Sequence, residues 1–116
     1  MKTIFCDIDG TLLKHHGSLS AQITNKPKIL EGVLKRLDEW DRKGYNIILV
    51  TGRKESLREL TEQQLMEVGI IYDQLVMGLS GAPRVLINDL KPHKPEMITA
   101  VAINLKRNQG IEDVEI

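Results

Sequence analysis

The chain has 116 residues, which suits one small domain with a single hydrophobic core. Its 16 Lys and Arg residues balance 16 Asp and Glu residues, so no global field attracts nucleic acid or an acidic membrane, and any phosphate binding has to be local. No apolar run approaches the roughly 18 residues that cross a bilayer, and the amino terminus lacks a signal-peptide pattern, so we expect one cytoplasmic domain over residues 1–116.

The first predicted element is a strand over residues 3–8, an apolar run that leads into Asp-Ile-Asp-Gly-Thr at positions 7–11. Such a run predicts a strand buried on both faces, and the glycine after it allows a sharp turn close to a ligand. Open parallel α/β sheets bind ligands beyond the carboxyl ends of their strands, so we expect the chemistry at Asp7 and Asp9. Cys6 lies inside this strand and is interpreted as core rather than as a thiol nucleophile, because adjacent strand side chains point to opposite faces.

Residues 12–26 are polar with little periodicity, which predicts a loop or small hairpin over the tip of the first strand. Its two histidines, His15 and His16, have no partner at zinc-like spacing and are interpreted as solvated loop residues. Apolar residues then recur at helical spacing from Pro27 to Gly44, which predicts a helix with one face on the sheet.

Residues 45–50 form a second apolar run that predicts another buried strand, and Thr51 and Gly52 stand at its tip. The threonine hydroxyl and the glycine amide are neutral donors suited to phosphate oxygens. A Ser-x-x-Glu pattern predicts a capped helix over residues 56–68, and Gly69 is expected to end it.

Three further strands are expected in the second half of the chain. They lie over residues 74–77, 85–87 and 99–105, and the middle one ends in an asparagine followed by Asp89. No linker long enough to separate two domains occurs in the chain.

These motifs resemble the haloacid dehalogenase-like superfamily, whose opening motif is a hydrophobic strand followed by Asp-x-Asp-Gly-Thr. Thr51 is similar to the family's second motif, a strand that ends in Ser or Thr, and Asp89 to its fourth, an apolar strand with an acidic tip. The resemblance implies an α/β fold: a three-layer Rossmann-like parallel sheet of about five strands, with helices on both faces and no cap domain.

The resemblance also implies a magnesium-dependent phosphomonoester hydrolase. Asp7 would attack phosphorus and form an aspartyl-phosphate, while Asp9 would serve as acid and base. Mg²⁺ would be held by Asp7, the backbone carbonyl of Asp9 and Asp89. Thr51 and Gly52 would bind the phosphate.

The family's third motif, a lysine before the fourth strand, has no counterpart in this chain. Arg84 and Lys91 are the candidates for the missing positive charge. Arg84 precedes the expected fourth strand and would lie about 13 Å from Asp89 at the usual rise per residue. Lys91 follows the carboxyl end of that strand, so we favour Lys91 as the phosphate-binding cation.

The expected substrate is a small sugar or nucleotide phosphate, with neither nucleic acid nor membrane as a partner. An open site without a cap also suggests a homo-oligomer. Two alternatives remain at this stage. One is a catalytically degenerate module that binds a phosphate ligand or a protein, and the other is a phosphotransferase that moves phosphate to an acceptor other than water.

Overall fold

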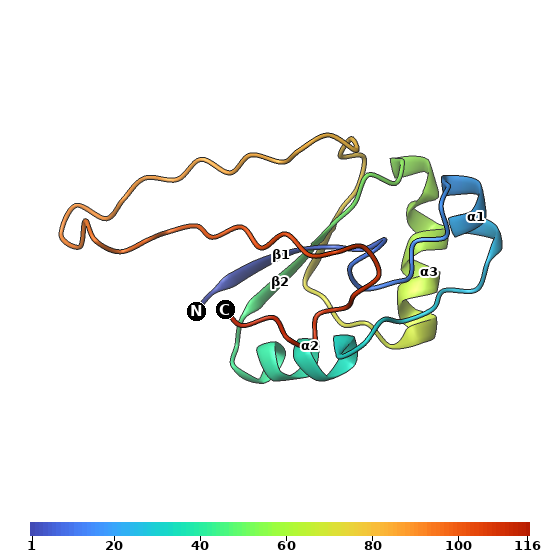
Figure 1. The fold of residues 1–116 in the computed structure, drawn as a ribbon, viewed down its shortest axis with the longest axis horizontal. Helices are drawn as coiled ribbons and strands as arrows, with labels where there is room; N and C mark the ends of the chain where they lie inside the picture. Colours follow the sequence, from blue (N-terminus) through green and yellow to red (C-terminus); the bar gives the residue numbers. More distant parts are fainter.

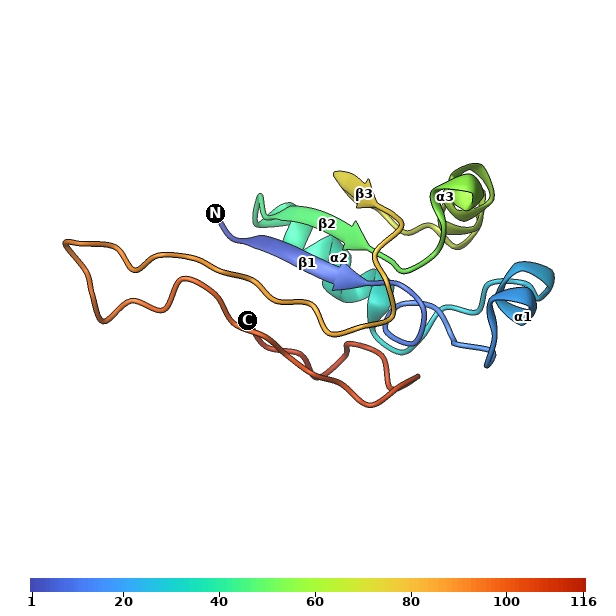
Figure 2. The same ribbon diagram turned by 90° about the horizontal axis from the view of Figure 1, so that it is seen from above.

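The computed structural model describes residues 1–116 and has a parallel three-stranded sheet at its centre. The strands lie in the order β1-β2-β3, with bounds β1 Thr3–Asp7, β2 Asn46–Val50 and β3 Gln74–Val76. Asp7 pairs with Val50, which pairs in turn with Val76, so the three strands end at one edge of the sheet. The arrowheads of β1 and β2 lie at that same edge (Figure 2), so the residues that follow these strands are brought together there.

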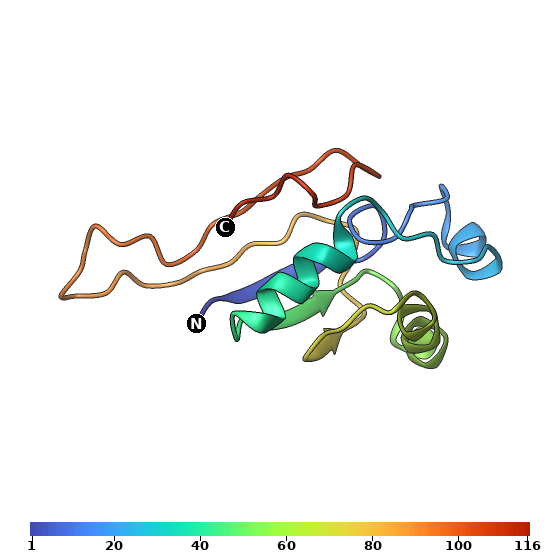
Figure 3. The ribbon, with the colours of Figure 1, turned by 90° about the horizontal axis from the view of Figure 1, so that it is seen from below.

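Three α-helices and one 3₁₀ turn surround the sheet. Their bounds are α1 Leu19–Thr24, α2 Val33–Arg42, η1 Glu55–Leu57 and α3 Arg58–Val68. Helix α2 lies across one face of β1 and β2 (Figure 3). It buries Val33, Leu37 and Trp40, whose spacing of three and four residues places them on one side of the helix. Helices α1 and α3 lie beyond the carboxyl ends of β1 and β2 (Figure 1).

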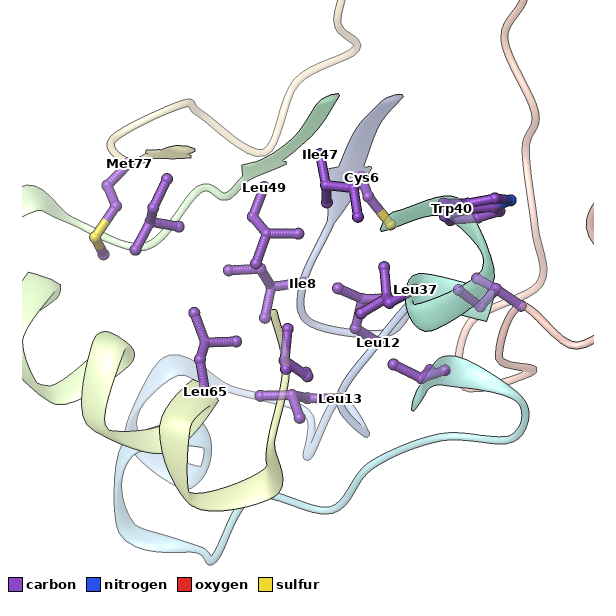
Figure 4. Packing of buried hydrophobic residues seen from close by; sticks show 14 residues of the cluster. Cys6, Ile8, Leu12, Leu13, Leu37, Trp40, Ile47, Leu49, Leu65 and Met77 are labelled. Carbon is purple, nitrogen blue, oxygen red and sulfur yellow. The ribbon is translucent and has the colours of Figure 1, made fainter. Parts of the chain in front are cut away.

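The hydrophobic core is one cluster of 14 buried residues. Three completely buried side chains approach one another at its centre (Figure 4): Ile8, which follows β1, Leu49 of β2, and Leu65 of α3. Cys6 belongs to the cluster, as predicted. Burial, and then the neighbouring charge of Asp7, raise the pKa of the Cys6 thiol to about 12, so the thiol stays protonated at neutral pH and is no nucleophile.

Two of the expected helix boundaries are wrong. The helix expected from Pro27 begins at Val33 instead, because Ile29 pairs with Leu13 in a β-bridge and Gly32 takes a left-handed φ of 73°. Ser56 lies within η1 and does not cap α3, whose first residue follows Leu57 without a side-chain cap. The predicted end at Gly69 is confirmed, with the left-handed conformation typical of a helix C-cap.

The largest departure concerns residues 83–104, called the arm below. The strands expected over 85–87 and 99–105 are not formed, and the arm instead extends away from the sheet and returns (Figure 1). Its apolar side chains are exposed, with Ile87 at 89% and Val101 at 77%. The α/β fold with a parallel sheet is thus confirmed, whereas the structure does not confirm five strands or helices on both faces.

The arm makes the molecule elongated, with extents of 50 × 28 × 25 Å. Its two limbs are joined by few bonds, among them one from the Thr99 hydroxyl to the Asp89 carbonyl at 2.7 Å. None of the helices is both long and apolar enough to traverse a lipid bilayer.

Candidate active site

The carboxyl ends of β1 and β2 open into a cavity of about 380 Å³. This volume falls within the range of roughly 300–1,000 Å³ that is usual for ligand pockets. Its charged lining consists of two aspartates and three arginines: Asp7, Asp9, Arg53, Arg84 and Arg107. Three cations therefore surround two carboxylates at the edge of the sheet where the sequence predicts the chemistry.

Asp9 is held by a buried arginine that follows the tip of β2. The Nε and Nη2 groups of Arg53 each donate a hydrogen bond of 2.8 Å to one oxygen of the Asp9 carboxylate. The Arg53 side chain is only 3% exposed and that of Asp9 16%. Two parallel N–H bonds to one carboxylate fix both the position and the orientation of the acid.

The remaining polar contacts of this pair come from α1 and α3. Nη1 of Arg53 donates to the Thr61 hydroxyl at 3.1 Å and to Oε1 of Gln64 at 2.7 Å. Nε2 of Gln22 donates to Oδ1 of Asp9 at 2.7 Å. The polar segment read as a loop thus contains the short helix α1, and it supplies a third donor to Asp9.

Asp7 is much less constrained. Its Oδ2 accepts a hydrogen bond from the Thr11 hydroxyl at 3.3 Å, and its Oδ1 accepts one from Nη1 of Arg84 at 3.1 Å. The Asp7 side chain is 34% exposed, so it is accessible from the cavity. The structure therefore brings together an accessible carboxylate and a fixed one, two residues apart.

Thr51 and Gly52 line the same cavity, as expected. The Thr51 hydroxyl accepts a bond from the backbone N–H of Arg53 at 3.1 Å, which leaves its own proton free to be donated. A Cβ on Gly52 would lie 2.7 Å from the carbonyl oxygen of Leu79, so only glycine fits this turn. Their predicted contact with phosphate stays a prediction.

The structure corrects the preference between the two candidate cations. Arg84 forms an ion pair with Asp7, whereas Lys91 lies at the exposed turn of the arm, where its backbone pairs with Lys94. The preference for Lys91 assumed a fourth strand ending at the site, and that strand is not formed. Asp89, the expected third metal ligand, is also on the arm and lines neither cavity that contains Asp7. Their roles at the site stay predictions without structural support.

The carboxyl-terminal segment, residues 105–116, closes one side of the site. The backbone N–H of Asn108 donates to the Gly10 carbonyl at 2.8 Å, and its side-chain oxygen accepts from the N–H of His15 at 2.7 Å. These bonds place the neighbouring Arg107 at the cavity. His15 lines the cavity as well and is half-buried, so it is more enclosed than a solvated loop residue.

A family model for haloacid dehalogenase-like hydrolases matches residues 4–82, about two thirds of the chain. The chain belongs to this family. The resemblance drawn from the first motif is confirmed, and the matched range contains both aspartates, Thr51 and Arg53. None of the curated proteins matches the chain.

Solved structures give the same fold. Two structures of a Pnkp1/Rnl/Hen1 complex, one described as an RNA repair complex, match 72% of this chain at 32% identity, with TM-scores of 0.60 and 0.58. The chain spans only 30% and 27% of those longer chains. A protein from Vibrio cholerae matches 85% of this chain over 90% of its own length, at 20% identity and a TM-score of 0.53. That last likeness concerns the fold alone.

These neighbours overturn the partners expected from the sequence. The expected partner is a small phosphate ester, with nucleic acid excluded because the net charge is zero. The homo-oligomer expected from the open site stays a prediction. The two neighbours at 32% identity come instead from a Pnkp1/Rnl/Hen1 complex, which one of the two structures describes as an RNA repair complex. The physical reason is that a balanced total charge says nothing about local charge, and three of the arginines gather at this one cavity.

The residues at the site fit a magnesium ion with few protein ligands. No cluster of three or more His, Cys, Asp or Glu side chains is present. Asp7 offers an accessible carboxylate, and no hydrogen bond of the chain ends on the backbone carbonyl of Asp9. Magnesium usually keeps several waters and needs only one or two carboxylates in addition to substrate phosphate. The Asp7 carboxylate and the Asp9 carbonyl, two hard oxygens from residues that line the cavity, would meet that requirement.

Proposed function

We propose that this chain is a magnesium-dependent phosphomonoesterase that acts through a phosphorylated Asp7. The contrast between the two carboxylates carries the proposal. Both oxygens of Asp9 are bonded to Arg53, whereas Asp7 is accessible and has one cation beside it. An accessible carboxylate is suited to attack, and a fixed one is suited to proton transfer.

In the first half of the reaction, an oxygen of Asp7 forms a bond to phosphorus as the bond from phosphorus to the ester oxygen breaks. That leaving oxygen takes a proton from Asp9. In the second half, a water oxygen forms a bond to phosphorus, the phosphate leaves Asp7, and Asp9 recovers its proton from the water. Arg84 offsets negative charge on the transferred group. Magnesium, held by the Asp7 carboxylate and the Asp9 carbonyl, would neutralise phosphate charge when bound.

The substrate we propose is a phosphate monoester at the end of an RNA strand. Arg84 and Arg107 line the cavity, and no acidic partner is bonded to Arg107. A cavity with an excess of arginine favours a substrate that carries further phosphates beside the reacting one. The structural neighbours from an RNA repair complex support this choice.

The test is release of inorganic phosphate from short RNA strands that carry a 5′- or a 3′-terminal phosphate, with a mononucleotide for comparison. Asp7→Asn is the inactive control, and Arg42→Gln is the matched surface control, because Arg42 pairs only with Asp38 at the surface. We expect release by the native chain and by Arg42→Gln, faster from RNA than from the mononucleotide. Release no faster than with Asp7→Asn from any of these substrates would exclude the proposal. A preference for the mononucleotide would reject the RNA substrate alone.

A further inference from the structure

Arg53 is the most completely bonded charged residue in the site. Its guanidinium makes two bonds to Asp9, one to Thr61 and one to Gln64, which use four of its five N–H groups. Its backbone follows the tip of β2, and its partners come from the turn after β1 and from α3. The side chain is therefore fixed from two directions, although it lies at the wall of an open cavity.

Fold stability alone does not account for such a pair. Taking an arginine and an aspartate out of water costs free energy that their attraction often fails to offset, and apolar replacements of similar volume are frequently as stable. This pair lies beside Asp7 at the open end of the sheet rather than in the centre of the core. Its position points to a role in the reaction.

The hydrogen bonds define the state of Asp9 in this arrangement. A guanidinium and a side-chain amide N–H only donate, so each oxygen of Asp9 acts as an acceptor. Oδ1 accepts two bonds, from Arg53 and Gln22, whereas Oδ2 accepts one and keeps a lone pair for another proton. This is the form that Asp9 takes after giving its proton to a leaving group and before taking one from water.

We propose that Arg53 is a positioning residue that holds Asp9 as the proton acceptor for hydrolysis of phosphorylated Asp7. The inference rests on the function proposed above. In this step the water oxygen bonds to phosphorus and the bond between phosphorus and the Asp7 oxygen breaks, with its electron pair returning to the Asp7 carboxylate. The proton of the water passes to Oδ2 of Asp9. Arg53 touches neither water nor phosphate in this step and acts through Asp9.

The consequence is a specific kinetic pattern. With an activated aryl ester such as p-nitrophenyl phosphate, the first half-reaction needs little help from an acid, because the leaving group is stable without a proton. A variant that weakens the hydrogen bonds to Asp9 should then slow only the second half-reaction, the hydrolysis of phosphorylated Asp7. Both kcat and KM should fall together by about tenfold or more, while kcat/KM stays nearly constant. The phosphorylated protein should accumulate.

The experiment measures kcat, KM and the fraction of acid-quenched protein that carries ³²P, using labelled p-nitrophenyl phosphate and magnesium. Arg53→Lys keeps the charge but cannot make two parallel bonds to a carboxylate. Gln22→Met removes the third donor without touching Arg53, and it carries the test if Arg53→Lys does not fold. Arg42→Gln is the surface control.

The proposal expects label to accumulate in Arg53→Lys and in Gln22→Met, with kcat and KM lowered together and Arg42→Gln unchanged. A fall in kcat/KM equal to the fall in kcat, without added label, would mean a merely structural role and would overturn the inference while leaving the proposed function intact. If the native chain itself neither turns over the ester nor takes up label, the proposed function fails, and the inference with it.

Discussion

Gly110 holds the carboxyl-terminal segment against the turn before α2, and its replacement by alanine tests that packing. Its φ of +85° favours glycine, and an added Cβ would lie 2.8 Å from the backbone nitrogen of Glu31. The two segments would have to separate, which would break the 3.1 Å bond from Ile111 to the Glu31 carbonyl and expose Ile111, now 2% exposed. Gly78 has a similar φ of +79° but nothing within 4 Å, so Gly78→Ala is the matched control.

For Gly78→Ala only the left-handed backbone matters, and we expect a loss of about 1 kcal/mol in the free energy of unfolding. For Gly110→Ala we expect a loss of about 4 kcal/mol in the free energy of unfolding, because the same conformational cost is joined by a lost hydrogen bond and by the exposure of Ile111. Urea unfolding followed by the fluorescence of Trp40, the single tryptophan, measures both values. Equal losses for the two variants would refute the packing of the carboxyl-terminal segment described above.

Three further predictions test other parts of the structure. Because folding raises the pKa of the Cys6 thiol from 9.0 to about 12, the contribution of this thiol to stability is complete below pH 9 and is lost as the pH rises toward 12. Urea unfolding at several pH values should show this loss in the native chain and not in Cys6→Ala. Because residues 83–104 lie outside the core, a glutamate-specific endoproteinase should cut first after the exposed Glu96, and initial cleavage within the sheet would contradict the exposed arm. Arg84→Gln should lower kcat/KM by about 100-fold, whereas Arg42→Gln should not; equal activities would remove Arg84 from the site.

Most elements of the first two thirds of the chain could be predicted because they have their own local signal, whereas the short helix α1 lies in a polar segment without periodicity and was missed. An apolar run identifies β1 and β2, and helical spacing identifies α2 and α3. The same apolar signal occurs over 85–87 and 99–105, yet these segments form no strand. A strand exists only through hydrogen bonds to a neighbouring strand, and hydrophobicity alone does not determine whether the neighbour is there.

The site shows the same division between local and long-range information. Asp7 and Asp9 were found because they share one short motif with a glycine that turns the chain. Arg53 and Gln22 were missed, because each reaches Asp9 across the fold, over 44 and 13 residues of sequence. The available signal was Arg53 itself, an arginine directly after Thr51 and Gly52 at the tip of a buried strand.

The central claim is that Asp7 accepts a phosphoryl group, and chemical trapping tests it most directly. The native chain is mixed with p-nitrophenyl phosphate and magnesium, quenched in acid and treated with borohydride, which reduces an acyl phosphate to an alcohol. Peptide mass spectrometry then locates the change. The account predicts homoserine at position 7 in the native chain and in larger amount in Arg53→Lys, with aspartate unchanged at position 9. Reduction at position 9, or unmodified aspartate at both positions despite phosphate release, would contradict it.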